Sequence, residues 1–415
     1  PRHLRFLMVR NFFDTPLVGK VARMFETIPI SATRAKDAIR AAAEAAEEGA
    51  AVCIFPEGRL THTGMLNEIK SGYSIIARRA SCPVLPVYVD GLWGSIFSAE
   101  RGRFFWKLPR EIPYGVRVSF GEVLPPDADA ETLRASFNRE AGVVMARRRE
   151  MTSSVDGLLR RLDLSAPALH WWSGGEFHSC TWRDVGKVVD GVREPVHLAP
   201  DHGGARGWLD AWRDLAGLGE KELRALVLNA LQVTDCGDLG TGQFPVAIHP
   251  EVEPVVWRVW GLLVPALTGT TAVALARVES RESLAAVDSR LSLQNLVGGA
   301  QLAAILRAAE NRFPGWREFS FEGAPQEEVA GRLKRYRGLV HAGRIVSVSI
   351  PHPPIIRARD LIQPGWREGS VGRMLTGIAV RSLPEGLQLE SPLWDAPVTL
   401  PGYESGADGF VVPKG

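Results

Sequence analysis

The chain has 415 residues, of which 45% are hydrophobic and 23% charged, and its formal net charge is +2. This ordinary globular composition excludes collagen, long coiled coils and long disordered tracts, and at about 100–200 residues per domain the length predicts two or three domains. Residues 1–150 hold 22 Lys+Arg and 17 Asp+Glu, a net charge of +5, which leaves 27 and 30, a net charge of −3, for residues 151–415. The basic first part favours anionic partners, lipid phosphate or nucleic acid, although a solvated surface without a partner would have the same charge.

The first expected element is an amphipathic helix over residues 12–25. Phe13, Leu17, Val21 and Phe25 recur at four-residue spacing, and Pro16 suits the first turn of a helix. The apolar stripe would face either the core of the domain or, as the sharper alternative, a bilayer surface.

Strands and helices then alternate along the first 150 residues. Short apolar runs predict strands at residues 27–30, 51–55, 84–89 and 115–120, the second of them buried. Helices are expected at residues 35–49, at 71–80, and after the turn at 125–130 as far as the arginines at 147–149. This alternation predicts an α/β layer architecture.

A domain boundary is expected near Ser153, which gives units of residues 1–152 and 153–415. Ten of the 12 tryptophans follow this point, so the two parts differ in composition. No run reaches the roughly 18 consecutive apolar residues of a transmembrane helix, so any membrane association is expected to be peripheral. We interpret the start at Pro1, inside a patterned segment and without an initiator Met, as a truncation.

Several classes of protein are not supported by the sequence. The four cysteines are far apart and form no Cys-x-x-Cys pair, so no disulfide scaffold and no metal site are indicated, and a reducing location is expected. Arginines of the basic part are not interleaved with aromatic residues, which argues against nucleic-acid binding. The Gly-x-Ser-x-Gly motif of nucleophile-elbow hydrolases is absent from the sequence.

The densest polar cluster directly follows the strand expected at residues 51–55. It reads Phe-Pro-Glu-Gly-Arg-Leu-Thr-His-Thr-Gly over residues 55–64. Open α/β sheets place ligands at the carboxyl ends of their strands. Gly58 would let the backbone approach a phosphate while Arg59 binds its oxygens, and Glu57 would accept a hydroxyl or orient Arg59. A surface loop with an incidental ion pair is the alternative for these residues.

This cluster resembles the third conserved block of the glycerolipid acyltransferases, which acylate lysophospholipids or glycerol phosphate. The motif Phe-Pro-Glu-Gly-Arg-x-Thr-x-Thr-Gly is similar to that of the bifunctional acyltransferase and acyl-carrier-protein synthetase proteins. Residues 28–31 with Arg34 and Ala38 resemble the second block, and residues 84–91 resemble the fourth. Several ordered blocks within 150 residues are much more specific than any one of them.

The resemblance implies transfer of a fatty acyl group from acyl-ACP or acyl-CoA to a lysophospholipid or acylglycerol phosphate. In the family the base is the His of a His-x-x-x-x-Asp block, whose Asp orients the imidazole. None of the nine histidines here has Asp five positions on, and His62 is followed there by Asn67. The catalytic dyad is therefore expected upstream of Pro1, and His3 and His62 are expected to be ordinary polar residues.

Carried over by position, the resemblance implies that one turn binds the phosphate or glycerol of the acceptor, with residues Phe55, Pro56, Glu57, Gly58 and Arg59. Arg34 is a candidate for a second phosphate contact, although the family's usual Arg lies closer to its strand. Pro86 would shape a strand end that lines the site, or would simply start the strand. Cys53 and Cys82 lie in apolar sequence and are expected in the core, not as nucleophiles.

The second part of the chain resembles the adenylate-forming acyl ligases in several ordered segments. Residues 167–185 resemble their opening strands and helix, and residues 260–269 resemble a mid-domain helix. Residues 369–373 with Gly377 resemble a late block of the same domain. The resemblance implies the large subdomain of these ligases, ending before the small one.

Two departures from the ligase pattern predict that this domain has lost its ATP chemistry. The ligases bind ATP phosphates with a Ser/Thr/Gly-rich loop that ends in Pro-Lys-Gly, whereas residues 234–249 contain no Lys. Val340 and His341 stand where the ligases carry Thr and the magnesium-binding Glu, and a neutral imidazole is a poor ligand for that ion. The interpretation is a degenerate domain retained for fold, docking or carrier binding; a divergent but working site in a shifted register is the alternative.

The sequence thus predicts an α/β protein: an acyltransferase-type mixed sheet flanked by helices, then a second α/β domain resembling a ligase large subdomain. The favoured function is a bacterial acyltransferase of phospholipid biosynthesis or remodelling, without cofactor, on the cytoplasmic face of the inner or plasma membrane. A non-catalytic acyl-carrier-binding or scaffolding protein built from the same two domains is the alternative.

Overall fold

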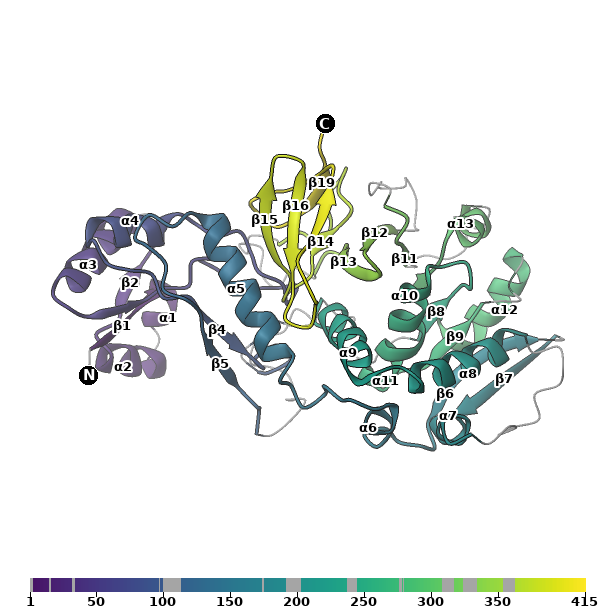
Figure 1. Cartoon of the computed structure of the whole chain (residues 1–415). Helices are drawn as coiled ribbons and strands as arrows, with labels where there is room; N and C mark the ends of the chain where they lie inside the picture. Colours follow the sequence, from purple (N-terminus) through teal and green to yellow (C-terminus); the bar gives the residue numbers. More distant parts are fainter. Residues whose placement is uncertain are drawn as a thin grey trace.

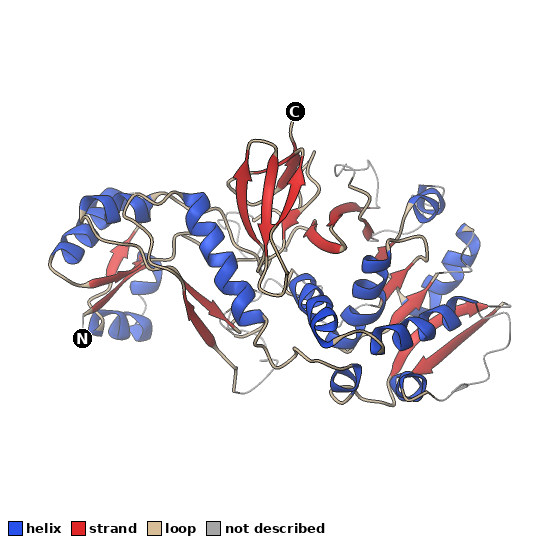
Figure 2. Ribbon diagram, viewed as in Figure 1, coloured by secondary structure: helices blue, strands red, loops and turns tan. Residues whose placement is uncertain are grey.

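The computed structural model describes residues 3–14, 16–31, 34–96, 98–99, 113–173, 175–191, 203–236, 245–275, 278, 280–307, 317–323, 334–353 and 363–415. Figure 1 shows two lobes, one built from the first 150 residues and one from the middle of the chain. The C-terminal strands, drawn in yellow, lie between these lobes. Parallel and antiparallel strands both occur and helices cover them (Figure 2), so the predicted mixed α/β class is confirmed.

The first lobe is built on a three-stranded parallel sheet. Its strands, in spatial order, are β2 (Ile28–Ile30), β1 (Leu4–Val9) and β3 (Ala51–Cys53). Helices α3 (Ala35–Glu47) and α4 (Gly72–Arg79) enclose the core, where Leu7 of the central strand is buried with Ala42, Ala43 and Ile76. Because the strands are parallel, the segments that follow β2 and β3 leave the same edge of this sheet.

Three expectations for this lobe need correction. The strand expected at residues 51–55 ends at Cys53 and is half-buried, because β3 pairs only with β1 and lies at the edge of the described sheet. The single helix expected at 12–25 is two helices, α1 (Arg10–Phe13) and α2 (Pro16–Met24). Strand β1 was not expected at all, although it is the centre of the sheet.

A separate antiparallel pair of strands completes the first lobe. It consists of β4 (Val87–Asp90) and β5 (Arg117–Phe120). The strand expected at 84–89 therefore starts later, and Val84 forms only an isolated bridge with Leu124. Helix α5 (Ala130–Met145) packs against the pair and begins at Asp129, whose carboxylate accepts a hydrogen bond from the Thr132 amide at 2.8 Å. The strands of this lobe are thus mixed in direction, as predicted, but are divided between two sheets.

The second lobe is built on a nine-stranded sheet in the order β14-β13-β12-β11-β10-β8-β9-β6-β7. Its strands are β6 (Pro167–Ser173), β7 (Glu176–Thr181), β8 (Val246–Ile248), β9 (Ala272–Ala274), β10 (Asn295–Val297), β11 (Arg317–Ser320), β12 (Lys334–His341), β13 (Arg344–Val348) and β14 (Arg373–Met374). Its helices are α6 (Val155–Leu159), α7 (Trp182–Val189), α8 (Gly203–Ala216), α9 (Glu220–Thr234), α10 (Pro254–Val256), η4 (Trp257–Leu263), α11 (Val264–Thr268), α12 (Arg281–Leu291) and α13 (Ala300–Arg307). The opening strands and helix expected at 167–185 are present as β6, β7 and α7.

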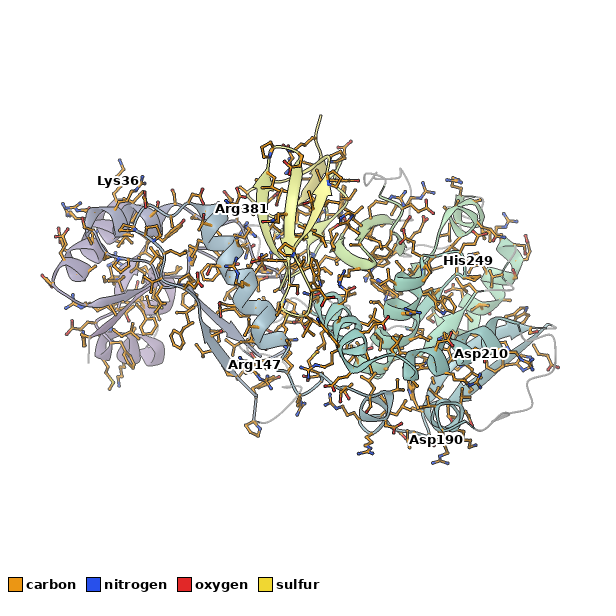
Figure 3. All side chains as sticks on the ribbon, in the orientation of Figure 1. Lys36, Arg147, Asp190, Asp210, His249 and Arg381 are labelled. Atoms are coloured by element: carbon orange, nitrogen blue, oxygen red, sulfur yellow. The ribbon has the colours of Figure 1, made fainter. Side chains whose placement is uncertain are left out.

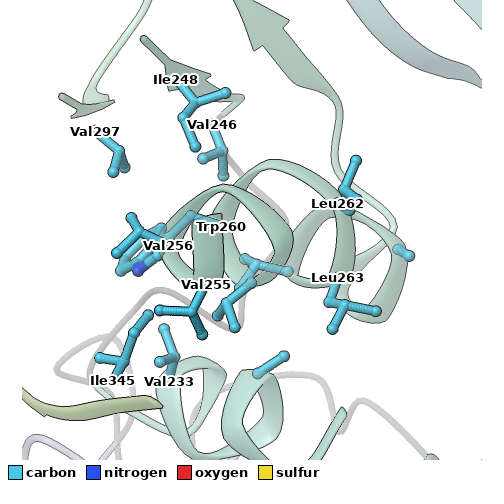
Figure 4. Close-up of a cluster of buried hydrophobic side chains, with 14 of the residues drawn as sticks. Val233, Val246, Ile248, Val255, Val256, Trp260, Leu262, Leu263, Val297 and Ile345 are labelled. Atoms are coloured by element: carbon cyan, nitrogen blue, oxygen red, sulfur yellow. The ribbon is translucent and has the colours of Figure 1, made fainter. Parts of the chain in front are cut away.

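The core of the second lobe lies between the sheet and the helices α9 and η4. Figure 4 shows Trp260 of η4 among aliphatic side chains of β8, β10, β13 and α9, all of them buried. Trp260 also packs against Phe319 of β11 with the rings tilted by 34° and their centroids 5.2 Å apart. The helix expected at residues 260–269 is thus present as η4 and α11 and belongs to this core.

The C-terminal strands pack against α5 of the first lobe. They are β15 (Ala379–Leu383), β16 (Gly386–Glu390) and β17 (Val398–Pro401) in one sheet, and β18 (Tyr403–Ser405) and β19 (Val411–Pro413) in another. The Ser382 amide donates to Glu131, and Arg139 donates to Glu390 at 2.7 Å from its Nε. Figure 3 shows side chains filling the space between α5 and β15, where Arg381 is labelled. The C-terminal strands are therefore joined to the first lobe through α5.

Candidate functional site

The turn of residues 55–59 leaves β3 at the carboxyl edge of the parallel sheet. The Gly58 amide donates to the Phe55 carbonyl at 3.0 Å and closes the turn. Gly58 has φ +65°, a conformation that other residues adopt only at a cost. A Cβ atom built there would meet no atom within 4 Å, so the backbone at Gly58 is open to an approaching ligand. Phe55 is 65% exposed on the same turn.

The turn is the first part of a longer loop, residues 56–70, which we call the motif loop. The Lys70 amide donates to the Pro56 carbonyl at 2.8 Å and joins the two ends of the loop. Inside it, the Glu57 Oε2 atom accepts a hydrogen bond from the Asn67 amide at 2.6 Å. Glu57 therefore uses one carboxylate oxygen to hold the loop together. Burial raises the pKa of this carboxyl, and the hydrogen bonds from Asn67 only partly oppose the rise.

One hydrogen-bond donor of Arg59 is unsatisfied. Its Nε atom is buried and has no hydrogen-bond partner, and leaving a donor in this state typically costs about 1–3 kcal/mol. The guanidinium is close enough to Glu57 for its charge to lower the pKa of that carboxyl. A ligand oxygen would satisfy the unpartnered donor, and a guanidinium suits phosphate oxygens.

The other two residues expected at the site lie next to two different strands, Arg34 after β2 and Pro86 before β4. Arg34 is exposed at the start of α3, after β2, and so lies on the same sheet edge as the turn. Pro86 is buried and directly precedes β4, and its carbonyl accepts a hydrogen bond from the Gly121 amide at 2.9 Å. Pro86 thus occupies the position of a proline that starts a strand.

Two arginines not expected from the sequence bind the backbone of the motif loop. Arg134 of α5 donates to the Asn67 carbonyl, and Arg373 of β14 donates to the Leu66 carbonyl at 3.2 Å. Burial lowers the pKa of both guanidinium groups, that of Arg373 to about 10. Arg134 lies 67 residues from its partner and Arg373 307 residues from its own, so no local pattern could have indicated either contact.

His3, His62 and Cys53 were not expected from the sequence to act as base or nucleophile. His3 lies 3.7 Å from Glu26 at the surface, and the His62 amide donates to Gln363. Burial raises the pKa of the Cys53 thiol, which disfavours a reactive thiolate. In the part of the chain that the structure describes, no group of three or more His, Cys, Asp or Glu side chains is arranged to hold a metal ion. Within those same residues, no helix is both long and apolar enough to cross a bilayer.

The segments expected to correspond to the ligase ATP site fall partly outside the described residues, since residues 237–244 are not described. Val340 and His341 are in β12, paired with Ile345 and Arg344 of β13. The His341 ring interacts through Nε2 with the Thr399 carbonyl at 2.8 Å. His341 is therefore engaged with the C-terminal sheet.

Comparisons with known proteins found a family match for the start of the chain. Residues 1–90 match the family model described as Acyltransferase. A 1-acyl-sn-glycerol-3-phosphate acyltransferase of Brassica napus chloroplasts is 28% identical over 90 residues, which are 21% of this chain and 26% of that protein. The chain thus spans about a quarter of the curated relative it matches.

Solved structures of two kinds are similar to parts of the chain. The 1-acyl-sn-glycerophosphate acyltransferase of Thermotoga maritima is 22% identical, with a TM-score of 0.23, over 30% of this chain and 47% of its own. An acyl-CoA synthetase of Brucella canis is 12% identical, with a TM-score of 0.40, over 61% of this chain and 72% of its own. Neighbours of the second lobe are of this synthetase-like kind.

Proposed function

Because residues 1–90 are an acyltransferase-family segment, we propose that the protein transfers a fatty acyl group to the hydroxyl of a lysophospholipid or acylglycerol phosphate. One observation carries the proposal: the buried, unpartnered Nε of Arg59, in a turn that leaves the carboxyl edge of the sheet beside an open Gly58 backbone. A phosphate on the acceptor would supply the oxygens that this turn lacks.

In the proposed reaction, the role of the turn is to bind and orient the acceptor. The acceptor hydroxyl oxygen attacks the thioester carbonyl of acyl-ACP or acyl-CoA, the carbon–oxygen bond forms, and the carbon–sulfur bond breaks. The hydroxyl proton passes to a general base, and the leaving thiolate is protonated. No residue of this chain is assigned as the base, since none of its histidines has Asp five positions on. Arg59 would hold the acceptor phosphate, and Glu57 would keep the loop in shape.

Exposed apolar side chains next to the turn suit a lipid substrate. Phe55 is 65% exposed and Leu60 45% exposed, on either side of Glu57–Arg59 in sequence. Elsewhere in the first lobe, before β2, Met24 is 79% exposed and Phe25 47% exposed, beside the basic residue Arg23. Exposed apolar residues with a neighbouring cation are typical of surfaces that rest on anionic lipid. We therefore include peripheral binding at the cytoplasmic face of a membrane in the proposal.

The test is an acyl-transfer assay on the full-length protein with a labelled acyl thioester and 1-acylglycerol 3-phosphate. Arg59→Ala is expected to lower kcat/KM for the acceptor by at least about tenfold, the usual worth of a charge-assisted hydrogen bond. Arg40→Ala is the matched control, because Arg40 is exposed on α3 and forms surface ion pairs with Asp37 and Glu44.

The outcomes of this assay separate the two functions considered. Activity that falls in Arg59→Ala and not in Arg40→Ala supports the proposed acceptor site. Equal activity in wild type and Arg59→Ala would remove the turn from acceptor binding. Absence of acyl transfer by the wild type with either acyl-ACP or acyl-CoA would favour the non-catalytic scaffold.

A further inference from the structure

The second lobe reaches into the motif loop through one buried amide. Gln363 is 1% exposed, and its Oε1 atom accepts two hydrogen bonds from amides of the loop. The donors are the His62 amide at 2.8 Å and the Thr63 amide at 3.2 Å, and the Thr61 hydroxyl oxygen lies 3.1 Å from the same Oε1 atom. Because buried backbone amides are nearly always hydrogen-bonded, the Gln363 oxygen matters most for the His62 amide, whereas the Thr63 amide also has a longer contact with the Thr61 hydroxyl oxygen at 3.4 Å.

The other half of the same side chain binds the returning part of the loop. The Gln363 Nε2 atom donates to the Met65 carbonyl at 3.1 Å. The Thr61 hydroxyl also donates to the Met65 carbonyl, at 2.8 Å. The oxygen of the Gln363 side-chain amide thus contacts residues 62 and 63, and its nitrogen contacts residue 65, on the other side of one tight bend. A side chain that only accepts, or only donates, cannot replace both contacts.

Gln363 is itself held firmly in the second lobe. Two residues on, the Gly365 carbonyl accepts from the Ile350 amide at 3.1 Å, and the Gly365 amide donates to the His352 ring at 3.1 Å. A Cβ on Gly365 would come within 2.3 Å of the Pro351 carbonyl oxygen, so the two segments are in direct backbone contact. The amide of Gln363 therefore projects from an anchored segment.

The contact extends to the acceptor turn through Asn67. Arg373 donates to the Leu66 carbonyl, and Arg134 joins the Asn67 carbonyl to the Ala407 carbonyl of the C-terminal segment. The Asn67 amide in turn donates to the Glu57 carboxylate. The conformation of Glu57–Arg59 is thus linked by hydrogen bonds to groups of the second lobe.

We infer that Gln363 is a positioning residue, through which the second lobe holds the motif loop in the conformation that binds the acceptor. Gln363 touches the loop and acts on the acceptor only through it. We call the hydrogen bonds between the Gln363 side chain and residues 62, 63 and 65 the clamp. The inference rests on the proposed function for the role of the loop, but the clamp itself is a property of the fold. It gives the second lobe a task that does not require ATP.

The first test measures hydrogen exchange of single backbone amides by mass spectrometry with fragmentation, on the whole chain. Gln363→Leu removes both halves of the clamp, so the amides of His62 and Thr63 are expected to exchange about tenfold faster. Gln363→Glu keeps the accepting oxygen and loses the donor, so these two amides are expected to stay protected. The amides of β12 and β13 report whether the second lobe remains folded. Unchanged exchange at residues 62 and 63 in Gln363→Leu, with β12 and β13 protected, would overturn the clamp.

The second test measures acyl transfer by the full-length variants. Gln363→Leu is expected to raise KM for the acceptor severalfold and to leave KM for the acyl donor unchanged. Gln301→Ala is the matched control, because Gln301 is exposed on α13 of the same lobe. Faster exchange with an unchanged acceptor KM would overturn the positioning role. An inactive wild type would count against the proposed function, and the exchange experiment then decides the clamp by itself.

Discussion

Arg148 joins the two lobes: its Nη2 atom lies 2.6 Å from Oδ2 of Asp235, and the same guanidinium forms an ion pair with Asp90. Asp90 ends β4 in the first lobe, and Asp235 follows α9 in the second. Arg148 is 13% exposed and Asp90 3% exposed, so both charges are largely removed from water and depend on each other. The lobes are therefore tied by ionic contacts here as well as by the Gln363 clamp.

Arg148→Ala is expected to destabilise the protein by about 3–5 kcal/mol, because it leaves the buried Asp90 carboxylate without its partner. Urea unfolding followed by fluorescence measures the change. Arg213→Ala, which removes the exposed Arg213–Asp210 pair on α8, is the control and should cost at most about 0.5 kcal/mol. Equal midpoints for the two variants would show that the interface does not depend on Arg148.

Gly64→Ala is expected to disturb the contact between the motif loop and Asp235. Gly64 has φ +75°, and a Cβ there would lie 2.1 Å from the Asp235 carbonyl oxygen and 3.0 Å from the Trp93 ring. Gly343→Ala is the control for backbone strain, since Gly343 has φ +68° and nothing within 4 Å of the added Cβ. Both variants carry the left-handed penalty of about 1–2 kcal/mol.

The difference between these two glycine variants is the informative quantity. Calorimetric unfolding should show a larger loss of stability for Gly64→Ala than for Gly343→Ala, because only the first must move backbone of the other lobe. Losses of equal size would mean that the two lobes separate at this point without cost.

The pKa of Glu57 predicts a pH-dependent difference between the wild type and Glu57→Gln. Burial raises this pKa in the folded protein above the unfolded value of about 4.3, so on unfolding in this range the carboxyl releases its proton. The wild type therefore loses stability relative to Glu57→Gln as the pH rises from about 4.3 through the folded pKa. The glutamine still offers an oxygen to the Asn67 amide.

Melting temperatures of both proteins between pH 4 and pH 8 test this sign. The melting temperature of Glu57→Gln minus that of the wild type should increase as the pH rises through the folded pKa of Glu57 and should then stay constant. A difference that decreases toward neutral pH would contradict a raised pKa and would mean that the charged carboxylate stabilises the loop.

We expect that the intact protein forms no acyl-adenylate from a fatty acid and ATP. In the alignment expected from the sequence, Val340 and His341 stand where the ligases carry Thr and Glu, and the His341 ring is engaged with the Thr399 carbonyl. ATP–pyrophosphate exchange in the presence of fatty acid and Mg²⁺ measures the reaction, with a working acyl-CoA synthetase as positive control. Exchange above background would contradict the loss of ATP chemistry.

Local patterns were sufficient for much of the fold. The helix expected at 71–80 is α4, and the apolar run at 27–30 contains β2. Strand β1 was missed because its six residues, Leu-Arg-Phe-Leu-Met-Val, have no clear alternation and no turn signal before them. The expectation that residues 51–55 are buried failed because burial depends on how many strands and helices cover a strand, which its own sequence does not state.

The residues of the candidate site were also only partly predictable from the sequence. The turn at 55–59 was found because its residues are adjacent in sequence and follow a strand. Gln363, Arg373 and Arg134 were not found, because their contacts with the loop join residues 67 to 307 positions apart. The sequence therefore indicated the turn at 55–59 as a candidate acceptor site and gave no sign of the groups that hold the motif loop.

The most direct measurement of the central claim is acceptor selectivity in the full-length protein. It compares kcat/KM for 1-acylglycerol 3-phosphate with kcat/KM for acylation of the 2-hydroxyl of 1-monoacylglycerol, which keeps that hydroxyl and carries a hydroxyl in place of the phosphate. The wild type should favour the phosphate-bearing acceptor, and Arg59→Ala should reduce that preference by about 10- to 100-fold, the worth of a hydrogen bond to a charged group. An equal preference in the wild type and Arg59→Ala would contradict the assignment of this turn as the site of the acceptor phosphate.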